Sequence, residues 1–177
     1  MRLDFMRDAA KNFPEISQPL AITKLRVWNC KYKSFAKISE MKNLEELVIS
    51  SLPDEDFNFV SRLENLKYLS VVHLPKIKSI EPLKGLRALT SISLATSPSW
   101  DAANRTLEIE SLQPLSELKG LRHIELFGVR PLNGSLKVLE SLTSLETARF
   151  SKYQQDEVDR FFRVTSAKMG FNPKSSF

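Results

Sequence analysis

The sequence is poor in the residues from which metal, cofactor and catalytic sites are most often built. It contains one cysteine, two histidines and five glycines among 177 residues. No Cys-x-x-Cys, His-x-x-His or glycine-rich phosphate loop is present. We therefore expect no metal, no cofactor, no small-molecule substrate and no enzyme activity, although a Ser-His-Asp triad assembled from distant positions would leave no local pattern.

The single cysteine, Cys30, has no partner for an intramolecular disulfide. The local sequence offers no basic neighbour that would activate it, so we interpret it as a packed core thiol. A chain without disulfides is typical of a reducing compartment, and we expect a cytoplasmic protein. No apolar run approaches the roughly 18 residues that cross a bilayer. Residues 1–8 also lack the apolar core of a secretory signal, so we expect no membrane association.

A net charge of +5 raises nucleic acid as one possible partner. Basic residues gather between Lys24 and Lys42, but acidic residues at 54–56, Glu108 and Glu110 interrupt the basic character. There is no run of lysine or arginine and no aromatic RNA-binding motif. We therefore favour a mildly basic, solvated surface over a nucleic-acid site.

What the sequence does contain is a repeated apolar frame, L-x-x-I-x-L. Its starts are separated by 22, 22, 23, 32 and 24 residues, a period that indicates a solenoid. The alternation of apolar and polar residues at positions 4 to 6 predicts a short strand in each repeat, and stacked repeats would form a parallel sheet. The frame residues are Ile22/Leu25/Val27, Leu44/Leu47/Ile49, Leu66/Leu69/Val71, Leu89/Ile92/Leu94, Leu121/Ile124/Leu126 and Leu145/Ala148/Phe150.

The segments between frames carry a second pattern in two repeats. Residues 77–86 and 109–118 both match I-x-x-[IL]-x-P-L-x-x-L. Proline is suited to the first turn of a helix, because its fixed φ and missing N–H cost nothing there. Pro82 and Pro114 therefore predict short α or 3₁₀ turns on the convex side of the solenoid.

These features resemble the short, 22-residue class of leucine-rich repeats found in phosphatase-regulator-like and internalin-like proteins. The resemblance covers about residues 20–152. It implies an α/β fold, namely a right-handed solenoid of about six repeats with a parallel concave sheet, short convex α or 3₁₀ segments and helical caps. The ninth repeat position departs from the family's usual asparagine, so the turns must satisfy their backbone groups otherwise. It is occupied by Cys30, Leu52, Leu74, Ser97, Val129 and Tyr153.

We expect a single domain over residues 1–177, with repeats spanning 22–152. The 32-residue interval predicts an insertion near 96–106, where inserted loops often bind partners. Residues 153–177 are expected to form a C-terminal helical cap followed by a loose tail. Residues 1–21 are expected to form an N-terminal cap, and a helix is predicted there from the spacing of Leu3, Met6, Ala10 and Phe13.

Residues between the frame positions would face the concave side of the sheet or its edge. Aromatic residues and arginine are typical of interface hot spots, so this face and the insertion are the predicted partner-binding surface. Trp28 and Phe127 have the alternative of packing under a cap or loop, and Trp100 that of folding back onto its own loop. The two histidines are alternatively ordinary surface residues. The predicted partner-binding residues are Arg26, Trp28, Tyr68, Val72, His73, Trp100, His123, Glu125, Phe127 and Arg149.

The interpretation that follows is a non-catalytic protein that binds another protein through its concave sheet and the Trp100 loop. For so small a chain, occupying a partner's surface is simpler than bridging two partners, so we favour an inhibitor. A bacterial immunity protein that neutralises a toxin would fit this description. The alternatives are an adaptor that bridges two proteins, and a basic nucleic-acid-binding protein.

Overall fold

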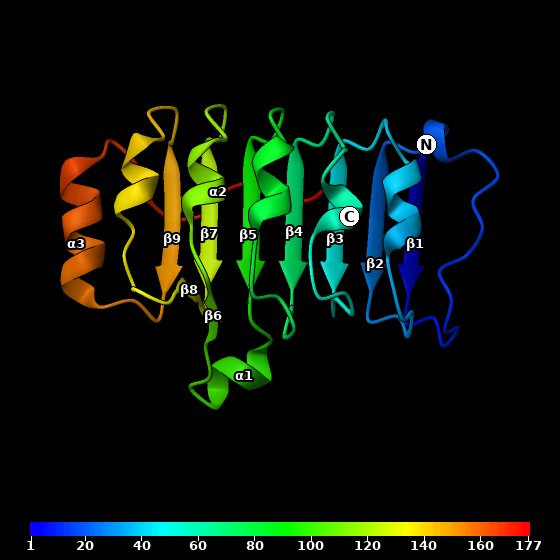
Figure 1. The fold of residues 1–177 in the computed structure, drawn as a ribbon, viewed down its shortest axis with the longest axis horizontal. Coiled ribbons are helices and arrows are strands. Elements are labelled where there is room, and N and C mark those ends of the chain that lie inside the picture. The colour runs from blue at the N-terminus through cyan, green and yellow to red at the C-terminus, as the bar shows by residue number, and fades with distance from the viewer.

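The computed structural model describes residues 1–177 and shows a parallel sheet of eight strands in the order β1-β2-β3-β4-β5-β7-β9-β10 (Figure 1). All neighbouring strands run parallel, which requires a crossover segment between each pair. A leucine-rich-repeat solenoid with a parallel sheet was predicted, and this prediction is confirmed. The strands are β1 (Arg2–Met6), β2 (Lys24–Trp28), β3 (Glu46–Ser50), β4 (Tyr68–Val72), β5 (Ser91–Ala95), β7 (His123–Phe127), β9 (Thr147–Ser151) and β10 (Lys168–Met169).

The repeated frame sets the register of the sheet. Leu25 pairs with Leu47, Leu47 with Leu69, and Leu69 with Ile92, so equivalent frame residues lie side by side. Every frame residue except Phe150 is buried in one continuous core. Stacking in this way lets each repeat cover the apolar side of its neighbours, which no single repeat could do alone.

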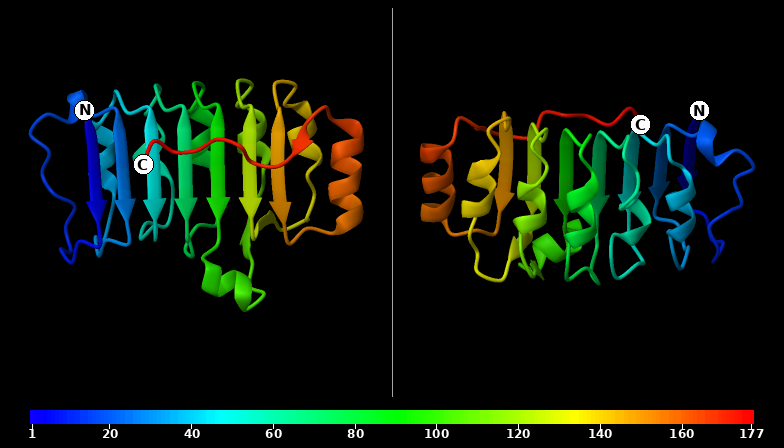
Figure 2. Two further views of the ribbon diagram at one scale, coloured as in Figure 1. Left: turned by 180° about the vertical axis from the view of Figure 1, so that it is seen from behind. Right: turned by 45° about the horizontal axis from the view of Figure 1, so that its top comes forward.

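Short helices return the chain along the convex side, opposite the open face of the sheet (Figures 1 and 2). Pro82 and Pro114 lie in the first turns of η4 and α2, as their fixed φ predicts. The convex helices are η2 (Ala36–Glu40), η3 (Asn58–Val60), η4 (Glu81–Gly85), α2 (Gln113–Ser116) and η5 (Lys137–Ser141), while η1 (Pro19–Ala21) lies in the turn just before β2.

Backbone hydrogen bonds replace the missing asparagines in the turns after the strands. The residue after the strand has a positive φ in most repeats, including Asn29, Ser51 and His73. Its N–H reaches the last strand residue of the next repeat: Ser51 N donates to Val72 O at 2.8 Å and His73 N to Ala95 O at 2.8 Å. The repeats are thus joined beyond the strands without a side-chain ladder.

The predicted N-terminal helix is wrong, because the first residues form strand β1, which pairs with β2. Burial along β1 alternates, with Leu3 and Phe5 partly buried and Met6 exposed. The unpaired edge of β2 offers a row of backbone donors and acceptors, and a strand satisfies them where a helix would not. Phe5 then packs edge-on against Phe13, with ring centroids 5.7 Å apart, and closes this end of the core.

Residues 96–106 leave the sheet and form helix α1 (Pro98–Ala102), which lies beyond the ends of the strands (Figure 1). Ser97 caps this helix by accepting a hydrogen bond from the Trp100 N–H. The chain returns through β6 (Leu107–Ile109), which pairs with β8 (Val129–Pro131) in a second, two-stranded sheet.

Helix α3 (Gln155–Val164) covers the other end of the solenoid. Its buried Phe161 packs edge-on against Phe150, with ring centroids 5.1 Å apart. The chain then forms β10 and continues across the open face of the sheet as far as β3 (Figure 2). We call residues 170–177 the tail. The expectation of a loose tail is wrong, because it is held to the sheet by specific contacts described below.

Candidate partner-binding face

The open side of the sheet, which we call the concave face, carries the first, third and fifth residues of each strand. The strand register aligns them in three rows that run across the molecule. The first row is Arg2, Lys24, Glu46, Tyr68, Ser91, His123 and Thr147. The third-residue row is Asp4, Arg26, Val48, Ser70, Ser93, Glu125 and Arg149, and the fifth-residue row is Met6, Trp28, Ser50, Val72, Ala95, Phe127 and Ser151.

Basic residues at the β2 end of this face are paired with acids on neighbouring strands. Arg26 Nε donates to Asp4 Oδ1 at 2.8 Å and Arg26 Nη2 to Asp4 Oδ2 at 2.5 Å. The Arg26 guanidinium holds the pKa of Asp4 below its usual range. Lys24 Nζ lies 3.6 Å from Glu46 Oε2. Both basic groups are therefore already paired with carboxylates on the sheet. The phosphates of a nucleic acid would have to displace these carboxylates to bind there.

Glu125 places a buried carboxylate under the centre of the concave face, with 6% of the residue exposed. Ser93 Oγ donates to its Oε1 at 2.6 Å. Its Oε2 has no hydrogen-bond donor, although the Arg149 guanidinium forms an ion pair with it. The two observations agree if Arg149 neutralises the charge without the alignment of a hydrogen bond. The Glu125 carboxylate is therefore held by Ser93 and by its ion pair with Arg149.

Glu125 borders a hollow of about 460 Å³ whose lining mixes apolar and polar side chains. Tyr68, Val72 and Phe127 line it from the sheet, and each is partly buried. The Arg149 guanidinium lies 5.2 Å from the centroid of the Phe127 ring, so the ring is also in contact with a cation. Burial raises the pKa of the Tyr68 hydroxyl, which therefore stays protonated and able to donate a hydrogen bond at neutral pH.

Trp28 lies at the end of β2, away from this hollow. It is partly buried and stands in the same row as Val72 and Phe127. The structure therefore places the predicted sheet residues on one face, but around the hollow it brings only Tyr68, Val72, Glu125, Phe127 and Arg149.

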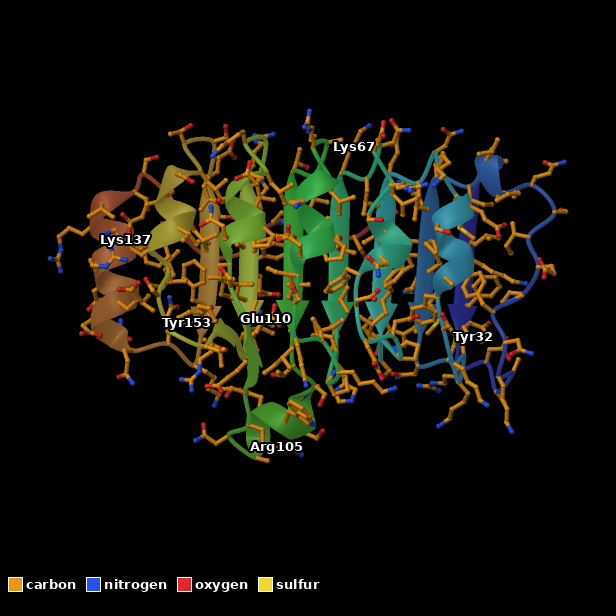
Figure 3. All side chains as sticks on the ribbon, viewed as in Figure 1. Tyr32, Lys67, Arg105, Glu110, Lys137 and Tyr153 are labelled. Atoms are coloured by element: carbon orange, nitrogen blue, oxygen red, sulfur yellow. The ribbon has the colours of Figure 1, made fainter.

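His73 and Trp100 lie at the edge of the concave face, where the strands end. Their rings meet edge-on with centroids 5.7 Å apart. The Arg105 guanidinium lies 4.2 Å from the centroid of the Trp100 ring, on the loop labelled in Figure 3. Trp100 is partly buried against the core, which corresponds to the alternative in which it folds back onto its own loop.

His123 lies at the opposite edge, at the start of β7. Its Nδ1 is 2.8 Å from Thr147 Oγ1. Burial lowers the pKa of His123, more than the charge of Glu146 raises it. The imidazole is therefore neutral at pH 7. A bound partner would meet a hydrogen-bonding group at this position and not a charge.

The tail supplies residues of this face that sequence reasoning missed. Phe171 and Pro173 border the hollow opposite the sheet, and Ser176 binds Glu46. The signal in the sequence is weak: an aromatic residue at each end of a short polar segment has no repeat and no helical period.

Elsewhere, the structure holds few arrangements with chemical potential. A larger hollow on the convex side, of about 770 Å³, lies between η4 and α2 and has no hydrophobic residue in its lining. No three His, Cys, Asp or Glu side chains come together as a metal site would require. None of the helices has the length and apolar character needed to cross a membrane.

Comparison with known proteins finds similarity only at the level of structure. No protein-family model matches the chain, and no curated protein matches its sequence. The chain is similar to an internalin (inlF) from Listeria monocytogenes, with a TM-score of 0.70 at 18% identity, covering 95% of this chain and 46% of that one. A second Listeria monocytogenes internalin (inlC2) gives a TM-score of 0.58 at 18% identity, with 94% and 71% covered.

The mouse RP105/MD-1 complex provides a third similar chain, with a TM-score of 0.54 at 15% identity, covering 97% of this chain and 38% of that one. The chain thus spans less than half the length of two of these three structures. Identities this low establish architecture only. Together with the repeated frame and the parallel sheet, they show that the chain has the leucine-rich-repeat fold.

Proposed function

We propose that this protein is a non-catalytic binding module that occupies the surface of a partner protein through its concave face. The observation that carries the proposal is the partly buried set of Tyr68, Val72 and Phe127 around the Glu125 carboxylate. The tail borders the hollow between these residues without filling it, and interface centres are enriched in aromatic groups and arginine.

Two further observations support a protein as the partner. The similar mouse structure is itself a complex of two proteins, RP105 and MD-1. The charges on the face are of both signs, and those of Arg26 and Lys24 are matched by carboxylates. A nucleic acid would favour one sign of charge, so the nucleic-acid alternative has less support.

Within protein binding, we favour an inhibitor or an immunity-type neutralising protein, of bacterial origin and cytoplasmic location. The single buried thiol, Cys30, supports a reducing compartment. Arg26, Trp28, His73, Trp100 and His123 extend the proposed surface to its edges. The alternative, an adaptor, requires a second binding surface in addition to the concave face.

Affinity capture from native extract, followed by stoichiometry, tests this function. The inhibitor predicts one protein bound one-to-one, and retention that changes little between about 50 and 200 mM salt, a range over which nucleic-acid binders lose orders of magnitude in affinity. Simultaneous binding of two different proteins would favour the adaptor. Recovery of nucleic acid that washes off steeply with salt would contradict protein binding altogether.

A further inference from the structure

The tail lies across the strands of the concave face, from β9 toward β3, in the view of Figure 2. Burial along it alternates: Phe171, Pro173, Ser175 and Phe177 are partly buried, while Asn172, Lys174 and Ser176 are exposed, although Ser176 also reaches Glu46 through its N–H and Oγ. Alternation with a period of two is the pattern of an extended chain with one side against a surface. The face therefore already holds a peptide, supplied by the molecule itself.

Glu46 holds the far end of the tail by two hydrogen bonds. Ser176 N donates to Oε1 at 2.6 Å and Ser176 Oγ donates to Oε2 at 2.6 Å. Glu46 is 8% exposed and stands on β3, where only Lys24 balances its charge, at 3.6 Å. Hydrogen bonds to an ionised acceptor are among the stronger ones in proteins, so a serine in an extended segment is well recognised here.

Two arginines contact the ring of Phe177, the residue that follows Ser176. The guanidinium carbons of Arg2 and Arg26 lie 4.0 and 5.1 Å from the centroid of the Phe177 ring. Arg2 Nη1 also donates to Ser176 O at 2.9 Å. Asp4 holds Arg26 in place by two hydrogen bonds, so the Arg26 side of this aromatic slot is fixed independently of the ring.

The middle of the tail borders the central hollow without filling it. Phe171 and Pro173 face Tyr68 and Phe127 across this space. Glu125 lies in the same lining, with its Oε2 ion-paired to Arg149. The tail leaves this hollow open, so a different peptide could place a side chain here that the tail does not.

Few backbone hydrogen bonds bind the tail to the sheet. Gly170 N donates to Ala148 O at 2.9 Å, and Ser176 N donates to the Glu46 side chain. The tail crosses the strands instead of joining their ladder, so side chains supply most of its contacts. A segment of this kind opens at low cost and can be replaced by another with the same side-chain pattern.

We propose that the concave face is a track for an extended peptide segment of the partner, which crosses the strands and presents a hydroxyl residue followed by an aromatic ring. The Glu46 carboxylate takes the hydroxyl and its backbone N–H, Arg2 and Arg26 take the ring, and the central hollow beside Tyr68 and Phe127 receives a further side chain of the partner. The tail occupies this track until the partner displaces it. This inference rests on the proposed function and specifies the form of the partner.

A synthetic peptide with the sequence of residues 170–177, amidated and labelled with fluorescein, tests the track by fluorescence anisotropy. The protein is the full chain, compared with a tail-loosened variant that carries Ser176→Ala and Phe177→Ala. An attached tail competes at an effective concentration on the order of millimolar. The peptide should therefore bind the tail-loosened variant at least about tenfold more tightly than the wild-type chain. Circular dichroism confirms that each variant is folded.

Glu46→Ala, added to the tail-loosened variant, should weaken peptide binding at least about fivefold, in line with loss of a hydrogen-bonded charge. Glu45→Ala is the matched control, because Glu45 pairs with Lys67 at 3.2 Å and makes no contact with the tail. It should leave the affinity unchanged. Equal affinity of the wild-type and loosened chains, absence of binding to the loosened chain, or equal effects of the two glutamate substitutions would each overturn the track.

This outcome is independent of whether a natural partner is found. Capture of a stoichiometric protein together with failure of the peptide to bind would leave the proposed function standing and remove the track. Binding of the peptide to the loosened variant without any captured protein would retain the track and remove support for the inhibitor.

Discussion

Gly128 is the residue at which the repeat geometry is least tolerant. Its φ of +69° lies in the left-handed region, as it does for Asn29 and Ser51 at equivalent turns. Those residues carry side chains, so the backbone conformation alone does not require glycine. A Cβ at Gly128 would also clash with the Thr96 hydroxyl, because the chain approaches closely where the insertion leaves the sheet. Among the five glycines, only Gly128 combines a positive φ with a clash of the added Cβ.

Gly128→Ala should lower the free energy of unfolding by about 2–3 kcal/mol, the sum of left-handed strain and overpacking. Gly134→Ala is the control, since its φ of +64° is similar but no atom lies within 4 Å of the added Cβ. It should cost only the left-handed strain, about 1–2 kcal/mol. Urea denaturation measures both. Equal losses would show that contact with Thr96 has no effect on stability.

At the scale of elements, the strand β1 shows where periodicity misleads. Leu3 and Met6 are three residues apart, which fits a helix, yet Leu3 and Phe5 also fit a strand. The sequence alone offers no means to choose, because the deciding factor is the free edge of β2, a tertiary feature. A helix would turn Met6 toward the core, whereas the strand turns Phe5 toward it and leaves Met6 exposed.

Phe5→Ala should therefore destabilise the protein by about 2 kcal/mol, since the ring packs against Phe13 and Tyr32. Met6→Ala should change stability by less than about 0.5 kcal/mol, because Met6 is 50% exposed. Thermal or urea unfolding of the two variants makes the comparison. The reverse order of effects would support the helix and contradict the strand.

Helix α3 is attached to the last repeat through an ionised glutamate. Glu157 Oε1 accepts hydrogen bonds from Leu136 N at 2.6 Å and from Arg160 Nη2 at 2.8 Å. The hydrogen bonds from Arg160 are the main cause that lowers the pKa of Glu157 to about 2. The folded protein thus binds a proton at Glu157 less readily than the unfolded chain does.

This cap should weaken in acid. Because the pKa of Glu157 is lower in the folded state, its contribution is complete above the unfolded pKa of about 4.3 and disappears as pH falls toward about 2. Glu157→Gln should cost about 1–2 kcal/mol at pH 7, and the difference from wild type should shrink through that window. Denaturation at several pH values tests this. A difference that stays constant from pH 7 to 2.5 would contradict it.

At the scale of the whole molecule, the repeats are the part of the structure that can be predicted from the sequence. The frame residues identified the strands, their register and the core, because one pattern recurs and each repeat buries the same positions. The outward residues of the candidate face, such as Tyr68 and Phe127, followed from the alternation of side chains along each strand. Sequence reasoning could not place the tail, since its contacts with Glu46 join residues 130 positions apart without any repeated signal.

The central claim is that a protein partner binds the concave face, and the affinity of the captured partner for two alanine variants tests it most directly. Phe127→Ala removes a ring at the central hollow and should weaken binding at least about thirtyfold, as hot-spot residues do. Leu20→Ala removes an apolar side chain from η1, outside the hollow, where the residue is 58% exposed, and should leave affinity unchanged. Unchanged affinity for Phe127→Ala, or a comparable loss for Leu20→Ala, would contradict the account.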